Sequence, residues 1–217
     1  KIEYFPYFEE RPGLSRILLL GDSISRGIRN STQWLYHEHA NIHGAPTNAL
    51  GFSRYDTGLK HWLGHCPWDL VQFNVGMHFH PKNPKDYTSW HKEYIQGITK
   101  IVQEIRKHSP SAYIVFALTT PSPFDSNATT PNRATCPHYN KFHMAGFVPE
   151  MNKVAKSVAK KLGIIINDRH SFLLPVLEKY QIECDVHYRL EGYQLLAQQD
   201  WKVMSTVLAI NDTRRRS

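Results

Sequence analysis

A Gly-Asp-Ser triplet at residues 21–23 is the first feature of this sequence that could do chemistry. Ser23 in this triplet follows an apolar run at residues 17–20. A serine at such a strand-to-helix turn has its hydroxyl held out of the sheet, near the unpaired amides of the next helix. Those amides can stabilise the oxyanion that forms when an acyl group is transferred to serine. Because the triplet also occurs in ordinary turns, it is a weak motif by itself.

An Asp-x-His triplet near the C-terminus supplies the other groups that a reactive serine needs. Asp185 and His187 stand shortly before an amphipathic segment at residues 191–208. A serine hydroxyl is a poor nucleophile unless a base takes its proton, and a carboxylate fixes the tautomer of that base. Taken singly, His187 could be a helix-entry residue and Asp185 a turn former. Together with Ser23 they predict a Ser-His-Asp site.

The elements that would position these residues alternate between short apolar strands and longer amphipathic helices. We expect strands at residues 17–20, 69–74, 112–118 and 164–166, and helices at 87–108, 147–162 and 191–208. Parallel strands cannot be joined by tight turns, so long helical connections indicate parallel pairing. The pattern predicts an α/β fold, a three-layer α/β/α sandwich with a mostly parallel central sheet. Functional groups in that fold collect beyond the carboxyl ends of the strands.

Composition favours one globular domain over the whole chain, residues 1–217, with a basic tail at 211–217 that we expect to be frayed. Hydrophobic residues make up 41% and charged residues 21% of the 217. No apolar run is long enough to span a membrane. The net charge of +7 would suit nucleic acid, but the basic residues are spread over helical segments. We therefore expect solvated helix faces and no nucleic-acid partner; attraction to anionic glycans is the weaker alternative.

Cysteines and glycosylation sequons bear on metal binding and on the compartment. Three cysteines allow one disulfide at most and show no zinc-ligand spacing: Cys66, Cys136 and Cys184. Three Asn-x-Ser/Thr sequons begin at Asn30, Asn127 and Asn211. The chain starts at Lys1 without an initiator Met or a signal peptide, as a processed product or a trimmed chain would. We expect no metal site, and a secreted or lumenal glycoprotein.

The two triplets in combination resemble the SGNH (GDSL) hydrolase superfamily. The resemblance covers most of the chain and implies the flavodoxin-like fold of those enzymes. In this superfamily the first-block serine is the nucleophile and the last-block histidine is the base. The resemblance therefore implies Ser23 as nucleophile, His187 as base and Asp185 as the acid that orients it. Such a mechanism requires no metal and no organic cofactor.

The last block departs from the family pattern in the position of its acid. That block usually has Asp three residues before His, but Cys184 occupies this position and Asp185 lies two residues before His187. A shorter spacing is seen in some relatives. Glu183 is the alternative acid.

The family's oxyanion hole combines the serine amide with a glycine from the second block and an asparagine from the third. Gly51 is our choice for the glycine, because we expect Gly58 to open the helix through Leu59 and Trp62. His78 stands where the asparagine belongs. An imidazole N–H can donate to an oxyanion as an amide can, and Asn74 is the competing donor.

Gly-Asp-Ser-x-x-Arg through Arg26, with Gly-x-His-Phe at residues 76–79, is similar to the PC-esterase branch. That branch includes lumenal proteins that add or remove O-acyl groups on glycans. We predict a serine esterase of O-acyl esters such as O-acetyl groups, with a small-molecule or carbohydrate substrate. The alternatives are an O-acyltransferase with the same site and a catalytically inactive glycan-binding member. A loop at residues 119–143 is interpreted as substrate-facing, and four residues could line a sugar-binding rim or simply pack: His80, Trp90, His138 and His143.

Overall fold

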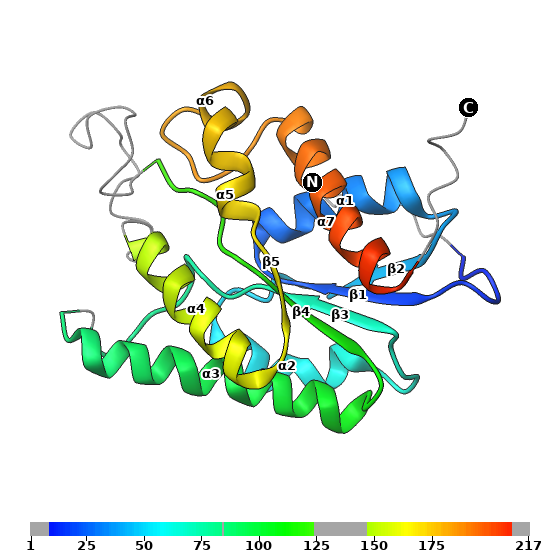
Figure 1. Ribbon diagram of the computed structural model, residues 1–217, viewed down its shortest axis with the longest axis horizontal. Helices are drawn as coiled ribbons and strands as arrows, with labels where there is room; N and C mark the ends of the chain where they lie inside the picture. Colours follow the sequence, from blue (N-terminus) through cyan, green and yellow to red (C-terminus); the bar gives the residue numbers. More distant parts are fainter. Residues whose placement is uncertain (1–8, 84, 124–146, 210–217) are drawn as a thin grey trace.

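A five-stranded parallel sheet forms the centre of the protein. The computed structural model describes residues 9–83, 85–123 and 147–209. The strands lie in the order β2-β1-β3-β4-β5, and every pairing in this sheet is parallel. The predicted three-layer α/β/α architecture is confirmed (Figure 1). The strands are β1 (Arg16–Leu20), β2 (Asn41–Gly44), β3 (Leu70–Phe73), β4 (Tyr113–Ala117) and β5 (Ile165–Asn167).

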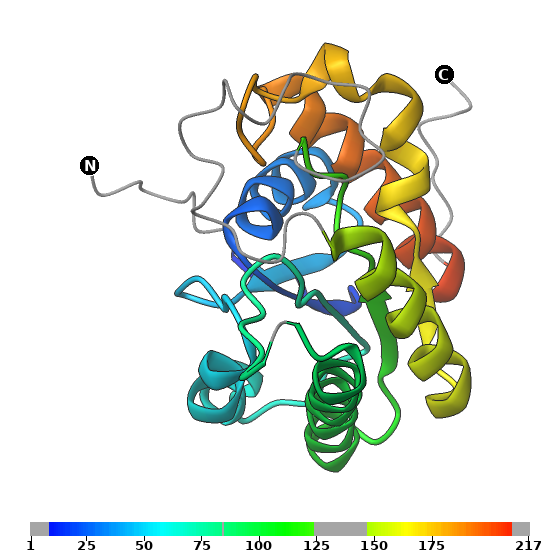
Figure 2. The ribbon, with the colours of Figure 1, turned by 90° about the vertical axis from the view of Figure 1, so that its left-hand side faces the viewer.

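Helices cover both faces of the sheet. Figure 1 shows α2 and α3 below the strands and α1 and α7 above them, and the view turned by 90° in Figure 2 shows the sheet between these layers. The long helices are α1 (Ser23–Tyr36), α2 (Phe52–Leu63), α3 (Tyr87–His108), α4 (Val148–Leu162) and α7 (Leu190–Val207). Three short elements follow β5: α5 (Arg169–Leu173), the 3₁₀ helix η4 (Leu174–Val176) and α6 (Leu177–Tyr180). No helix in the described ranges combines the length and apolar character needed to cross a membrane.

Side chains that alternate along the strands point to opposite faces of the sheet and pack into two separate apolar clusters. Leu18 and Leu20 pack into the larger cluster, which includes residues of α2, α3 and α4. Ile17 and Leu19 belong to the second cluster, beneath Trp201 of α7. This follows from the two-residue period of a strand, and burial of both faces explains the continuous apolar run that marks β1 in the sequence.

Two elements at the edge of this pattern differ from the sequence prediction. β2 was not predicted, because Asn41–Gly44 contains a single large aliphatic residue and lies at the sheet edge. The prediction that Gly58 opens the second helix was wrong: α2 begins at Phe52, after the Gly51 cap. The ring of Trp62 occupies the space beside Gly58, so this glycine serves close packing inside the helix. Gly163, between the helix predicted at 147–162 and the strand predicted at 164–166, caps α4 in the left-handed conformation at φ 61°.

Several sequence expectations concern residues outside the described ranges. These are the frayed tail at 211–217, the sequons at Asn127 and Asn211, Cys136, and the rim candidates His138 and His143. The described part of the predicted loop, residues 119–123, is buried. These expectations remain predictions.

Candidate active site

The hydroxyl of Ser23 and the imidazole of His187 meet although 164 residues separate them. Ser23 is the first residue of α1, two residues beyond the glycine that follows β1. Its Oγ lies 2.7 Å from His187 Nε2, within hydrogen-bonding distance. Both side chains are half-buried at the carboxyl edge of the sheet. A base is therefore placed to take the serine proton.

Asp185 is the carboxylate that contacts the imidazole. Its Oδ1 lies 2.6 Å from His187 Nδ1 and also accepts the backbone N–H of His187 at 3.1 Å. A bond from an aspartate oxygen to the amide two residues later is an Asx turn, which folds the carboxylate back beside the following side chain. The shortened spacing therefore still brings the carboxylate to the ring. Glu183, the alternative acid, is exposed, and its carboxylate has no hydrogen bond to His187 in the described structure.

A short hairpin-like loop holds Asp185 and His187 in place. Gln181 and Tyr188 form an antiparallel bridge, and Ile182 N donates to His187 O at 3.0 Å. Cys184 at the turn has a φ of 55°, a left-handed conformation that is uncommon for a non-glycine residue. Cys184 is also disulfide-bonded, whereas Cys66 is free. The antiparallel bridge and the disulfide at Cys184 both restrain the backbone next to Asp185.

The pKa of Asp185 shows that the carboxylate form is favoured in this loop. Partial burial alone would raise this pKa, because it disfavours the charged form. Hydrogen bonds from the side chain and backbone of His187 outweigh that cost and hold the pKa of Asp185 below its ordinary value of 3.8. The group beside His187 is therefore an anion at neutral pH.

Packing between α1 and α7 brings the serine and the histidine loop together. α7 begins at Leu190, three residues after His187. A Cβ atom at Gly27 of α1 would collide with the ring of Tyr193 of α7, so glycine allows the two helices to approach closely. Burial raises the pKa of Tyr193 to about 12, so its hydroxyl stays protonated beside the site.

Two backbone amides point to an oxyanion-binding region. Ser23 is the first residue of α1 and Gly51 caps the N-terminus of α2, so neither amide has an acceptor within its helix. Asp22 occupies the next two amides of α1, accepting from Ile24 N and Ser25 N at 3.0 and 3.2 Å. The cap therefore does not occupy the Ser23 amide.

Gly51 and His78, placed together only by hypothesis in the sequence, are in direct contact. A Cβ atom at Gly51 would collide with the carbonyl oxygen of His78, so only glycine fits at this point. The electrostatic neighbours of the half-buried His78 imidazole include Asp22 and His187. Burial is the main reason that the pKa of His78 lies below 6.5, and the electrostatic influence of His80 and His187 acts in the same direction. His78 is neutral at pH 7 and retains one N–H.

Asn74, the competing oxyanion donor, has its amide group engaged elsewhere. Its Nδ2 donates to Ala117 O at 2.8 Å and to Thr119 Oγ1 at 3.3 Å. These two bonds use both amide protons and tie the end of β3 to the end of β4. The side chain is buried, and both bonds of its amide nitrogen are made to the strand ends.

Two buried tyrosines that the sequence did not single out fix the same strand end. Tyr55 Oη donates to the carbonyl of Asn74 at 3.0 Å, and Tyr94 Oη donates to the carbonyl of Val75 at 2.5 Å. Both belong to helices on the face opposite α1. Nothing in the spacing of a core tyrosine tells which carbonyl its hydroxyl will reach, so no local signal could have found them.

A buried polar network below Ser23 was also missed. Asp200 of α7 accepts from Arg169 Nε and Nη2 at 2.8 and 2.5 Å. Gln72 and Asn167 donate to the same carboxylate at 2.7 and 2.8 Å. Arg169 Nη1 lies 3.5 Å from the hydroxyl of Ser25 on the first turn of α1. The sequence did contain a signal for this network. Asp200 lies on the same face of the last helix as the apolar residues Leu196 and Met204, and a charged residue on an apolar helix face indicates a buried polar partner.

One residue of the predicted sugar-binding rim is in the core. Trp90 is fully buried and packs its ring against His91 and Phe147, so of the two alternatives for this residue the structure shows packing. His80 is exposed. Within residues 9–83, 85–123 and 147–209, no group of three or more His, Cys, Asp or Glu side chains could hold a metal ion.

A hydroxyl, imidazole and carboxylate in series, at the carboxyl edge of a parallel α/β/α sheet, is the arrangement of a serine hydrolase. The sequence profile of the GDSL-like lipase/acylhydrolase family matches residues 19–195. The chain belongs to this family and is a serine ester hydrolase. No curated protein matches the sequence.

Solved structures with a similar fold are distant in sequence. A putative acylhydrolase from Bacteroides fragilis has a TM-score of 0.67 and 13% identity, covering 92% of this chain and 91% of that chain. The acetyl xylan esterase AlAXEase has a TM-score of 0.63 and 13% identity, covering 87% and 98%. Axe2, an acetylxylan esterase from Geobacillus stearothermophilus, has a TM-score of 0.58 and 15% identity, covering 87% and 93%. At these identities the likeness establishes the shared fold.

Proposed function

We propose that this protein hydrolyses O-acyl esters with Ser23 as nucleophile, His187 as general base and Asp185 as the acid that orients the imidazole. The 2.7 Å contact between Ser23 Oγ and His187 Nε2 is the observation that carries the proposal. The bond from Asp185 keeps a proton on Nδ1, so Nε2 can accept the serine proton.

The reaction proceeds by double displacement. Ser23 Oγ bonds to the ester carbonyl carbon while its proton moves to His187. The tetrahedral intermediate collapses as the bond to the alcohol oxygen breaks, and His187 returns the proton to the leaving alcohol. Water then attacks the acyl-enzyme with His187 as base, which releases the carboxylic acid and restores the serine.

The oxyanion is held by the amides of Ser23 and Gly51 and by the imidazole of His78. The backbone of Gly51 lies against the backbone carbonyl of His78, which supports placing these two chain segments at one site. His78 is favoured over Asn74 because both amide protons of Asn74 are used between strands. A neutral imidazole in this place donates an N–H to the negative oxygen that develops in the transition state.

An O-acetyl group on carbohydrate is the substrate that we favour. Two structural neighbours are described as acetyl xylan esterases, which supports this class without fixing the sugar. The Gly-Asp-Ser-x-x-Arg and Gly-x-His-Phe blocks also resemble the PC-esterase branch, which includes proteins that add or remove O-acyl groups on glycans. The acyl group would sit at Ser23 and the sugar would lie across the carboxyl edge of the sheet.

We further propose that the protein works in a secreted or lumenal compartment. The disulfide at Cys184 supports this location, because disulfides persist mainly in oxidising compartments. Alkylation of the unfolded, unreduced chain followed by peptide mapping tests it. The label should appear on Cys66 and not on Cys184; labelling of Cys184 in protein from the native source would contradict the proposal.

A fluorophosphonate probe and p-nitrophenyl acetate test the catalytic assignment. The wild-type chain should gain one covalent adduct that maps to Ser23, and Ser23→Ala should lose both the adduct and ester turnover. Ser53→Ala, an exposed serine on α2, is the matched control and should behave as the wild type. Unchanged turnover in a folded Ser23→Ala protein would refute the assignment.

A further inference from the structure

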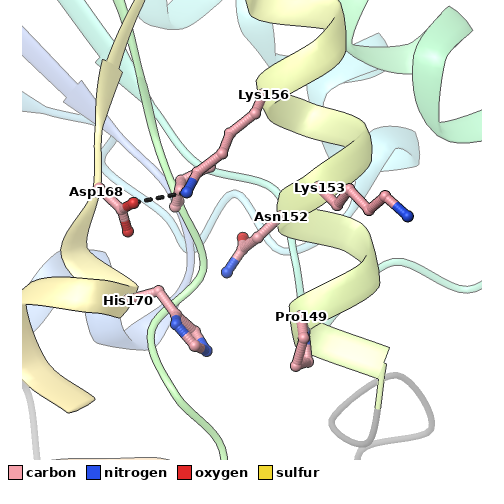
Figure 3. Close-up of a pocket in the computed structure, with 7 residues that line it drawn as sticks. Pro149, Asn152, Lys153, Lys156, Asp168 and His170 are labelled. Atoms are coloured by element: carbon pink, nitrogen blue, oxygen red, sulfur yellow. Dashed lines mark hydrogen bonds and ion pairs between the residues drawn. The ribbon is translucent and has the colours of Figure 1, made fainter. Parts of the chain in front are cut away.

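A hollow opens at the carboxyl edge of the sheet, the edge at which Ser23 lies. Its volume is about 330 Å³, within the range of about 300 to 1,000 Å³ that is usual for small-ligand pockets. Figure 3 shows it between the first turns of α4 and the segment that follows β5. We call it the Lys156 pocket; its lining includes Leu118, Pro149, Asn152, Lys156, Asp168 and His170.

The topology places this pocket within reach of the ester site. Leu118 directly follows β4 and Asp168 directly follows β5. β4 and β5 are the second and third neighbours of β1 on the β3 side of the sheet, which puts the pocket roughly 10–15 Å from the end of β1 at ordinary strand spacing. Arg169, between the pocket residues Asp168 and His170, reaches back to Ser25 on α1. One rigid segment therefore contributes to both places.

One ion pair joins the two sides of the pocket. Lys156 Nζ lies 2.7 Å from Asp168 Oδ2, and Figure 3 shows Lys156 reaching across from α4 to this carboxylate. Asp168 also accepts from Ser171 N and Ser171 Oγ at 2.9 and 3.1 Å. Lys153 belongs to the lining, but its amino group points away from this pair in Figure 3. An ammonium has three donors, so Lys156 can serve Asp168 and a ligand together.

The remaining walls are preformed and partly apolar. Asn152 accepts from Thr119 N at 2.9 Å and donates to Thr119 O at 2.8 Å, so its side chain is locked to the backbone. Pro149 and Leu118 add apolar surface beside the polar pair. Paired charges next to an apolar wall suit a ring that carries hydroxyl groups, because hydroxyls both donate and accept while the ring carbons need an apolar face.

We propose that the Lys156 pocket binds a neutral sugar unit of the acylated substrate, away from the ester that Ser23 attacks. This inference rests on the function proposed above, because it assigns the carbohydrate part of that substrate to a place. An anionic sugar fits less well, since Asp168 already neutralises the Lys156 cation and would repel a second carboxylate. The pocket thereby selects glycan esters over small free esters.

Direct titration tests the site without catalysis. Xylotriose is added to the full-length Ser23→Ala protein, and binding is followed by isothermal titration calorimetry. We expect saturable binding that weakens at least about tenfold in Lys156→Met, the loss that follows removal of one charged hydrogen-bond donor. His170→Ala should also weaken it, and Lys160→Met, an exposed lysine one turn along α4, is the matched control. No binding, equal affinity in Lys156→Met, or tighter binding of trigalacturonic acid would overturn the inference.

Kinetics separate a failure of the pocket from a failure of the proposed function. With acetylated xylotriose as substrate, Lys156→Met should raise KM. The factor should be at least about tenfold larger than the factor for p-nitrophenyl acetate. The latter ester is too small to reach from Ser23 to the pocket, so its KM should not depend on Lys156. An unchanged KM ratio, with Ser23→Ala inactive, refutes the pocket and leaves the esterase assignment intact. Full turnover by Ser23→Ala refutes the esterase assignment, and the titration still decides whether the pocket binds the sugar.

Discussion

Two carboxylates in this protein each pair with a basic side chain, one at the surface and one in the core. Asp185 is 38% exposed at its side chain and faces an imidazole, whereas Asp200 is fully buried and faces the guanidinium of Arg169. An imidazole changes its charge during acid-base catalysis, so its partner lies where substrate and solvent can reach. A guanidinium keeps its charge, so the buried pair does not take up or release a proton in this way. In the function proposed above the exposed carboxylate serves the reaction, whereas the buried one joins α7 to β3, β5 and α5.

Asp185→Asn gives the largest expected effect on this comparison. An amide no longer stabilises the imidazolium or fixes its tautomer, so kcat should fall about 10⁴-fold with little change in folding. Steady-state turnover of p-nitrophenyl acetate and thermal unfolding measure the two quantities. Glu183→Gln is the control and should keep its activity. A large loss in Glu183→Gln instead would transfer the acid's role to Glu183.

Asp200→Ala should act on stability. It leaves the Arg169 guanidinium buried without its carboxylate, which costs about 3–5 kcal/mol in comparable pairs. Urea unfolding followed by circular dichroism gives the free energy. Asp56→Ala, which removes the exposed ion pair with Lys100, is the control and should cost at most about 1 kcal/mol. Similar costs for both variants would mean that burial does not distinguish the two pairs.

His78→Ala should lower kcat about 10²- to 10³-fold, the usual effect of removing one oxyanion donor. His78→Asn, which restores an amide donor, should recover part of that loss. Asn74→Ala should mainly lower the free energy of unfolding, because its amide joins β3 to β4. The opposite outcome, a larger loss of kcat in Asn74→Ala than in His78→Ala, would make Asn74 the donor.

The smallest expected effect is the pH dependence of stability that His78 contributes. Its pKa is lowered by burial and by the neighbouring His80 and His187, against the opposing charge of Asp22. Below the ordinary histidine pKa of 6.5 the unfolded chain binds more protons than the folded one, so this contribution to stability is lost as the pH falls. The unfolding free energy between pH 5 and 7.5 should therefore slope less in His78→Asn than in the wild type. Equal slopes would show that His78 titrates alike in both states.

The amino-acid pattern alone was enough for the layered architecture and for the chemical groups of the site. Apolar runs such as residues 17–20, separated by long amphipathic segments, leave few ways to bury both faces of a sheet. Chemistry restricted the choice further, because a reactive serine needs a base and an acid, and both stand in one triplet near the C-terminus. These are properties of local sequence and of residue type.

Tertiary structure decided which of several similar groups came together. The Asx turn at Asp185 brings this carboxylate, and not that of Glu183, into contact with the imidazole of His187. Asn74 and His78 lie four residues apart in the sequence. The packing of β4 beside β3 engages the side-chain amide of Asn74 in a hydrogen bond to Ala117, whereas the imidazole of His78 is an electrostatic neighbour of His187. Hydrogen bonds such as that from Arg169 to Asp200 join residues 31 apart, and no local pattern encodes which buried partners will meet. Their identity depends on helix packing that forms only when the whole domain folds.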